Sequence, residues 1–327
     1  MGRLGGVVAA LAILVFVWSP YTLAQNATPT TEENRSPAGD TVTPLARATV
    51  DELPAGPVDI GLFRLTITPG AEDRTPGESG ISLVAMEAGD FTFHLAGEPS
   101  VMRSEGGGTP VEETVPAGHP VALTVGDTLL LPVGVRGTVR NDGQEAATAV
   151  VLFVRPSQMA TGVTPGATTT PNDVEPVGIT YRGVFGVVGE ELPAGPVVLT
   201  IERLTLEVGG SVPSHPHAGP ELSIIEEGFA RFTGEAGRIE LFDPGDLAQV
   251  RAAMGGVLPE VAIVFITPTP SFKLGSFSLQ EGDGALYHPG AIVGFQALEA
   301  LGPLVVLSGA IEPLANGGSS EASTPVM

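Results

Sequence analysis

The stretch Gly209–Gly228, GGSVPSHPHAGPELSIIEEG, holds two of the chain's five histidines, His215 and His217, and a carboxylate, Glu221, four positions after the second. Residues two apart on a β-strand point to the same face and lie ~6.6 Å apart, so both imidazoles can turn inward. Glu221 can join them from the same wall if the intervening turn does not break the alternation. Two neutral imidazoles and a carboxylate suit Mn, Fe, Ni, Cu or Zn. We therefore predict one divalent transition-metal site at His215, His217 and Glu221. The competing interpretation is a solvated loop stiffened by prolines.

The composition favours short strands over long helices. Of 327 residues, 43% are hydrophobic and 16% are charged, and the chain contains 44 glycines and 30 prolines. Apolar residues alternate with polar ones or run in short bursts, as in Ile60–Ile67 and Ala122–Leu131. The length exceeds the ~100 to 200 residues that one hydrophobic core typically serves. We predict an all-β chain of two domains, each a sandwich or jelly-roll barrel.

An internal repeat supports the division into two domains. The sequence LPAGPV occurs at Leu53–Val58 and again at Leu192–Val197, 139 residues later. At the same offset, Arg64-Leu65-Thr66 matches Arg203-Leu204-Thr205. Solenoid repeats have periods of up to ~50 residues, so a repeat of this length indicates a duplicated domain.

Low-complexity segments separate the predicted domains. Near the N-terminus, the apolar run Gly5–Trp18 precedes a small-residue pattern ending at Ala24, which is typical of a cleaved secretory signal. This run is shorter than the ~20 residues of a membrane-spanning helix, and its retention as an anchor is the alternative. The expected organisation is a signal peptide at 1–24, a disordered linker at 25–50, an N-terminal barrel at 51–156, a Thr/Pro-rich linker at 157–177, a C-terminal barrel at 178–313 and a disordered tail at 314–327. We expect a secreted or extracytoplasmic protein.

Charge and cysteine content exclude several classes of partner and site. The formal net charge of −22 repels phosphate backbones and anionic lipid headgroups, so we expect no nucleic-acid partner and no membrane contact beyond the signal segment. The absence of cysteine excludes disulfides and thiolate metal ligands. Adjacent acids such as Glu226 and Glu227 point to opposite faces of a strand, and we expect them to be solvated charges.

The spacing within Gly209–Gly228 resembles the first signature of the cupin superfamily at every defined position. The second cupin signature is similar to Gly126–Gly134 in the first unit and to Gly282–Gly290 in the second, although an alternative placement exists at Asp243–Asp246. The resemblance implies a bicupin, with two tandem double-stranded β-helix barrels in one polypeptide. It also implies a fourth, histidine ligand position, which holds Val293 in the second unit.

The first unit lacks the metal ligands that the resemblance places in the second. Its corresponding positions hold Pro76, Glu78, Ser82 and Gly137. This set cannot bind a transition metal tightly, so we predict that the first barrel is structural or encloses an apolar cavity. His288 is expected to be a surface histidine rather than a fourth ligand, and His94 and His119 to have no role in a site.

Three functions remain open on the sequence alone. The first is an exported bicupin that holds one metal ion and binds a small molecule without turnover. The second is a metal-dependent oxidoreductase of the oxygenase or oxidase type, with the same three residues around the metal. The third is a metal-free extracytoplasmic structural or interaction protein. The small molecule is not identified by any motif, and barrels of this type are expected to pair within the chain or between two copies of it.

Overall fold

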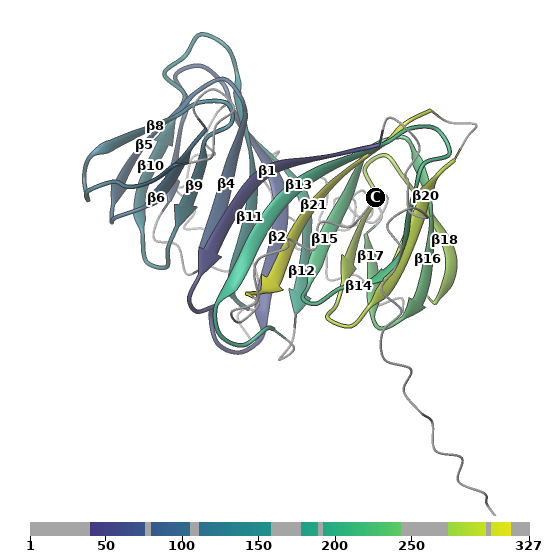
Figure 1. The fold of residues 1–327 in the computed structure, drawn as a ribbon. Helices are drawn as coiled ribbons and strands as arrows, with labels where there is room; N and C mark the ends of the chain where they lie inside the picture. The colour runs from purple at the N-terminus through teal and green to yellow at the C-terminus, as the bar shows by residue number, and fades with distance from the viewer. Residues whose placement is uncertain are drawn as a thin grey trace, which may run out of the picture. The chain divides into compact units, whose positions relative to one another are not determined.

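The computed structural model describes residues 40–75, 80–104, 111–157, 178–188, 192–242, 274–298 and 302–314. All regular secondary structure in these ranges is β-strand, which confirms the predicted all-β class (Figure 1). Within the same ranges, no helical segment has the length and hydropathy that a membrane crossing requires.

The strands of the first half precede those of the second along the chain. The first half contains β1 (Thr41–Val50), β2 (Val58–Ile67), β3 (Glu72–Thr75), β4 (Ile81–Ala88), β5 (Phe91–Ala96), β6 (Ser100–Arg103), β7 (Val111–Thr114), β8 (Pro120–Leu123), β9 (Thr128–Leu131), β10 (Arg136–Arg140) and β11 (Ala147–Pro156). The second half contains β12 (Ile179–Val188), β13 (Val197–Leu206), β14 (Ser211–Pro216), β15 (Glu221–Glu227), β16 (Phe229–Ala236), β17 (Ile239–Phe242), β18 (Gly275–Gln280), β19 (Gly284–Tyr287), β20 (Ile292–Ala297) and β21 (Leu304–Pro313).

These strands form two pairs of facing antiparallel sheets. The first barrel has a seven-stranded sheet, β12-β2-β11-β4-β9-β6-β7, and a four-stranded sheet, β3-β10-β5-β8. The second has a six-stranded sheet, β1-β13-β21-β15-β19-β17, and a four-stranded sheet, β14-β20-β16-β18. The predicted tandem jelly-roll architecture is therefore confirmed, with each barrel an open pair of sheets rather than a closed cylinder.

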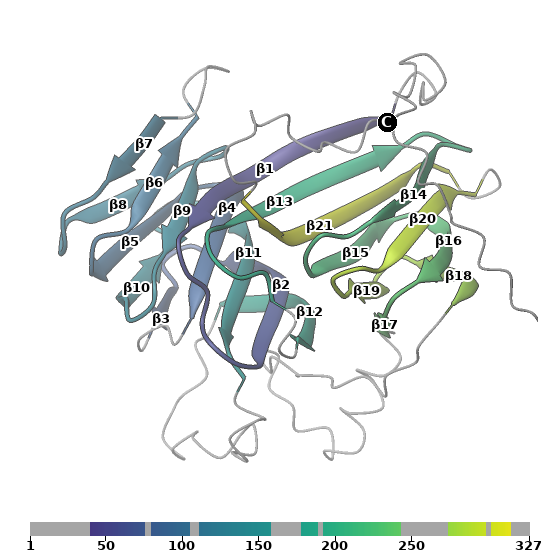
Figure 2. The same cartoon turned by 60° about the horizontal axis from the view of Figure 1, so that its bottom comes forward.

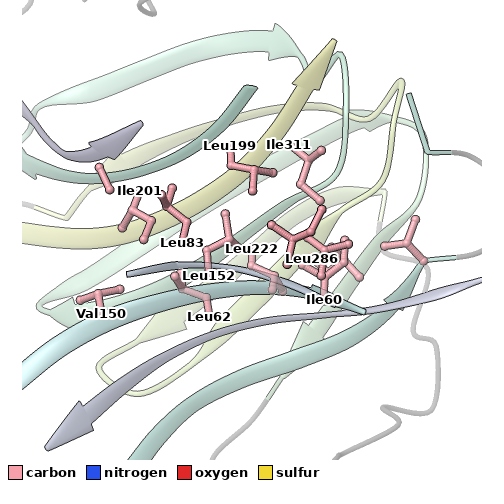
Figure 3. Close-up of a cluster of buried hydrophobic side chains, with 14 of the residues drawn as sticks. Ile60, Leu62, Leu83, Val150, Leu152, Leu199, Ile201, Leu222, Leu286 and Ile311 are labelled. Atoms are coloured by element: carbon pink, nitrogen blue, oxygen red, sulfur yellow. The ribbon is translucent and has the colours of Figure 1, made fainter. Parts of the chain in front are cut away.

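Apolar side chains fill the space between the two large sheets as well as the inside of each barrel. Figure 3 shows this shared core, in which Leu62 and Leu152 of the seven-stranded sheet meet Leu199 and Ile311 of the six-stranded sheet. Separate apolar clusters lie inside the first and the second barrel. Full burial of one such aliphatic side chain stabilises the fold by about 1.5–3 kcal/mol, so the shared core joins the two halves into one unit.

Each barrel receives its edge strand from the other half of the sequence. β1 pairs with β13 of the second barrel, and β12 pairs with β2 of the first (Figure 2). Residues 41–50, predicted as the end of a disordered linker, are therefore a strand. The prediction was wrong there because the apolar surface that orders β1 lies in another part of the sequence, where Ala46 joins the shared core.

Equivalent turns place the second signature at the later of its two possible positions. In the first half, Asp127 accepts a hydrogen bond from the backbone N–H of Thr124 at 3.0 Å. In the second half, Asp283 accepts one from the backbone N–H of Gln280 at 2.9 Å. This shared turn supports the placement that begins at Gly282, whereas residues 243–246 lie outside the described residues.

Candidate metal centre

Strand pairing directs His215 toward the inside of the second barrel. His215 lies near the end of β14 and stands opposite Val293 of β20. Val293 is only 1% exposed and belongs to the inner apolar cluster, and directly paired residues of an antiparallel ladder share one face. The position that the sequence signature reserves for a fourth ligand is thus directly across from His215, and an apolar side chain occupies it.

The three predicted ligands come together, but from two facing sheets. The Nδ1 atom of His217 lies 3.0 Å from Oε2 of Glu221, and the centroids of the His215 and His217 rings are 4.9 Å apart. The chain turns between Pro216, which ends β14, and Glu221, which begins β15 in the opposite sheet. The expectation that all three share one wall is therefore wrong, because this turn ends the strand alternation.

Both imidazoles have Nδ1 engaged. The Nδ1 atom of His215 lies 2.9 Å from the carbonyl oxygen of Pro213, which can only accept, so this nitrogen carries the proton. In His217, the partner of Nδ1 is the carboxylate of Glu221. A neutral imidazole protonated at Nδ1 presents a lone pair at Nε2, and metal-binding histidines are commonly held in this way through their other nitrogen.

The carboxylate of Glu221 is held in its ionised form. Burial alone would raise the pKa of Glu221, but the neighbouring His217 and a hydrogen bond with Ser308 outweigh burial and lower it below the ordinary value. Tyr287, the direct strand partner of Glu221, has a raised pKa because it is buried and faces this negative charge. The site therefore combines a carboxylate anion with a phenol that stays protonated.

The donor chemistry fits a divalent transition metal. His217 is 7% exposed, and its Nε2 atom is buried with no hydrogen-bond partner among the described residues, so its lone pair is available to a metal ion. In the ranges that the structure describes, no three His, Cys, Asp or Glu side chains are arranged to enclose a metal ion. Glu221 contacts Nδ1 of His217 in this structure, and through this contact it orients the imidazole.

Sequence reasoning missed the aromatic partner of this centre. The ring of Tyr287 lies 4.7 Å from that of His217, at an interplanar angle of 30°. Tyr287 is 2% exposed, and its hydroxyl has no hydrogen-bond partner at normal geometry. The residue ends the strand that directly follows Gly282 and Asp283, so the second signature could have identified it.

A group of further acidic residues near the centre was also missed. Glu202 on β13 and Glu312 on β21 are half-buried, and the pKa of each is raised, first by burial and then by the charge of Glu221. The positive charge of Arg47 on β1 acts to lower the pKa of both glutamates, but the raising effects are larger. These residues come from strands far apart in the sequence, and no local motif connects them.

His288 is not the surface histidine that the sequence predicted. It is 1% exposed, and its Nε2 atom lies 3.0 Å from Oε1 of Glu240, which also pairs with Arg238. The backbone N–H of Gly290 donates to the carbonyl of His217 at 2.8 Å, and this contact folds the following turn against the barrel. Glu240 is paired with Leu286, a residue of the shared core, so it lies on the opposite face of the sheet from the candidate centre.

Among the described residues, the remaining histidines, Ser82 and Gly137 add no ligand set. His94 and His119 are exposed. A Cβ atom at Gly137 would lie 2.1 Å from the carbonyl oxygen of His94, so no ligand side chain fits at that position. Ser82 is buried, whereas Pro76 and Glu78 lie outside the described residues.

No protein-family model matches the chain, and no curated protein matches it. Solved structures with a similar arrangement include a cupin 2 conserved barrel domain protein from Leptotrichia buccalis, at 9% identity and a TM-score of 0.34, covering 82% of this chain and 89% of that one. Oxalate decarboxylase from Lactobacillus farciminis, in its formate complex, is 12% identical with a TM-score of 0.41 and coverages of 84% and 86%. Procruciferin, an 11S globulin from Brassica napus, is 11% identical with a TM-score of 0.41 and coverages of 84% and 87%. Similarity this remote says nothing about the chemistry of this chain.

Proposed function

We propose that this chain, whose fold is of the two-barrel cupin type, is an exported protein that binds one divalent transition metal in its C-terminal barrel and uses it to recognise a small molecule. The observation that carries the proposal is that the Nδ1 atom of each imidazole already has a partner. His215 and His217 both have Nδ1 engaged, which leaves Nε2 of each as an available donor. Export rests on the signal-like sequence of residues 1–24.

The three residues have different parts in this proposal. His215 and His217 would bind the ion through Nε2. Glu221 holds the His217 ring and supplies negative charge next to a divalent cation. Val293 contributes no donor, so the ion would keep positions for water or a small molecule. The bound ion would act as a Lewis acid toward an oxygen or nitrogen of that molecule.

Elemental analysis of purified protein tests the proposal. The wild-type chain is expected to carry about one transition-metal ion after equilibration with Mn, Fe, Ni, Cu or Zn and gel filtration. His215→Ala and His217→Ala should each lose it, whereas His94→Ala, on an exposed strand position of the first barrel, should keep it. A wild-type protein without metal after equilibration with all five ions would overturn the proposal and leave the structural or interaction function.

Tyr287 favours a second candidate, a metal-dependent oxidoreductase of the dioxygenase type. Its hydroxyl stays protonated beside the candidate centre and makes no hydrogen bond at normal geometry, although Ser223 is close to it, so it could donate a hydrogen bond to a bound molecule. Oxygen uptake by the metal-loaded protein with phenols and organic acids would support this candidate. Equal uptake by Tyr287→Phe would show that the phenol has no part in it.

A further inference from the structure

The inner face of the six-stranded sheet changes from apolar to polar along its strands. Toward one end, Ile225 and Val306 belong to the apolar cluster inside the second barrel. Toward the other end, the same face carries small side chains, which are Thr200, Ser223, Ser308 and Ala310. All of these except Ser223 are partly exposed, so solvent reaches the sheet at this end although it lies inside the barrel.

Three carboxylates surround this small-residue area. Thr200, Ala310 and Glu221 are successive partners across β13, β21 and β15, so their side chains share one face. Glu202 lies two residues beyond Thr200, and Glu312 lies two residues beyond Ala310. Because the two strands are antiparallel, these glutamates flank the row on opposite sides. Glu312 is a diagonal neighbour of Glu221 on the adjacent strand, about 7–8 Å away, whereas β21 lies between Glu202 and Glu221.

The same area holds two buried polar atoms without partners. The Nε2 atom of His217 and the hydroxyl of Tyr287 have no hydrogen-bond partner at normal geometry, and both side chains are more than nine-tenths buried. The two rings are in contact, and Tyr287 is the strand partner of Glu221 on this face. Buried polar groups are nearly always hydrogen-bonded. In the proposed function the metal ion takes up Nε2 of His217, so the hydroxyl of Tyr287 is the atom that indicates a further bound molecule.

We propose that the small molecule recognised by this barrel carries a protonated amine, which binds between Glu202, Glu221 and Glu312. The proposal rests on the proposed function, because it names the class of molecule for the same barrel. An ammonium group has three N–H donors, and ionised carboxylates are pure acceptors, so the two are complementary in charge and hydrogen bonding. A dicarboxylate would meet these three like charges, which Arg47, the strand partner of Thr200 on the same face, offsets only in part. The half-burial of Glu202 and Glu312 strengthens this discrimination, since charges inside the barrel are less screened than surface charges.

Three four-carbon probes test the proposal on the metal-equilibrated full chain, namely 1,4-diaminobutane, succinate and 1,4-butanediol, with binding followed by saturation-transfer NMR and calorimetry. The diamine is expected to bind at least tenfold more tightly than the diol, and more tightly than succinate. The double variant Glu202→Gln/Glu312→Gln should bind the diamine at least fivefold more weakly. Diamine binding that is no tighter than that of succinate, or unchanged in this variant, would overturn the proposal.

A matched control separates the site from the general acidity of the protein. Glu112→Gln/Glu113→Gln removes two exposed charges from β7 of the first barrel, and diamine binding should stay at the wild-type value. An equal loss in both double variants would show non-specific attraction and overturn the proposal. Metal content measured on the same samples keeps the two proposals apart. Metal without selective diamine binding refutes only the amine, and Glu202-dependent diamine binding without metal refutes only the metal function.

Discussion

Arg64 and Arg203 hold the same two carboxylates, although one belongs to each barrel. Each arginine pairs with both Glu87 and Glu226. The two arginines are 139 residues apart in the sequence, and so are the two glutamates. The repeated residues of the two halves therefore form one symmetric ion cluster of four side chains between the barrels. The prediction that Glu226 is a solvated charge was wrong.

Removing one member of this cluster should destabilise the whole protein. Arg203→Ala leaves Glu87 and Glu226, both largely buried, with Arg64 as the remaining arginine of the cluster. We expect a loss of about 2 kcal/mol in the free energy of unfolding, between the values typical of surface and fully buried pairs. Urea denaturation measures this loss. Arg74→Ala, which removes an exposed pair with Glu72, is the control and should change stability by less than about 0.5 kcal/mol.

The same cluster should make the protein less stable in acid. Burial raises the pKa of Glu87, but hydrogen bonds from Arg64 and Arg203 outweigh it, so the folded-state pKa lies below the ordinary value of 4.5. The stabilisation by Glu87 is thus complete above about pH 4.5 and is lost as the pH falls through the lower folded-state pKa. In Glu87→Gln, the fall in melting temperature between pH 5 and pH 3 should be smaller than in wild type. An equal fall in both proteins would exclude a contribution from Glu87.

Glu202 and Glu312 should have the opposite effect on stability. Burial and the charge of Glu221 raise the pKa of both, so folding becomes less favourable once the pH exceeds the unfolded-state pKa of about 4.5. Glu202→Gln/Glu312→Gln should therefore melt at a higher temperature than wild type at pH 7, with the difference shrinking toward pH 4. Proteins commonly keep such destabilising charges where function needs them. A lower melting temperature of the variant at pH 7 would contradict this account.

The exchange of edge strands predicts that neither half folds fully alone. Residues 36–157 contain β1 but not its partner β13, and residues 178–327 contain β12 but not its partner β2. Each fragment would also expose its side of the shared core, so we expect aggregation or non-cooperative unfolding when it is expressed alone. Co-expressed fragments should purify together through affinity tags. A single fragment that is monomeric and unfolds cooperatively would contradict the prediction.

Local sequence patterns predicted much of the fold, but they did not predict contacts between residues far apart in the sequence. Alternating apolar residues, glycine turns and the repeat were enough to predict two all-β barrels, because these features act within a strand or a hairpin. The exchange of β1 and the burial of His288 depend on pairing with distant strands. The spacing around His215 identified three residues whose side chains lie near one another in the fold. It could not show that Glu221 lies on the facing sheet, because the turn that changes sheets has no separate sequence signal.

If His215 belongs to the proposed metal centre, a donor placed opposite it should strengthen metal binding. Val293 faces His215 directly across the β14–β20 pair and points into the barrel, so Val293→His places a third imidazole on the inner face next to the first. Valine and histidine differ in size, and the protein should lose about 1–3 kcal/mol of stability from overpacking without metal. With metal, we expect the dissociation constant to fall at least tenfold and the melting temperature to rise above that of the metal-free variant. Competition against a chromogenic chelator measures the affinity, and Val293→Leu controls for changes in packing. If Val293→His and Val293→Leu bind the metal equally well, the ion does not lie between His215 and position 293, and the candidate centre must be placed elsewhere in the barrel.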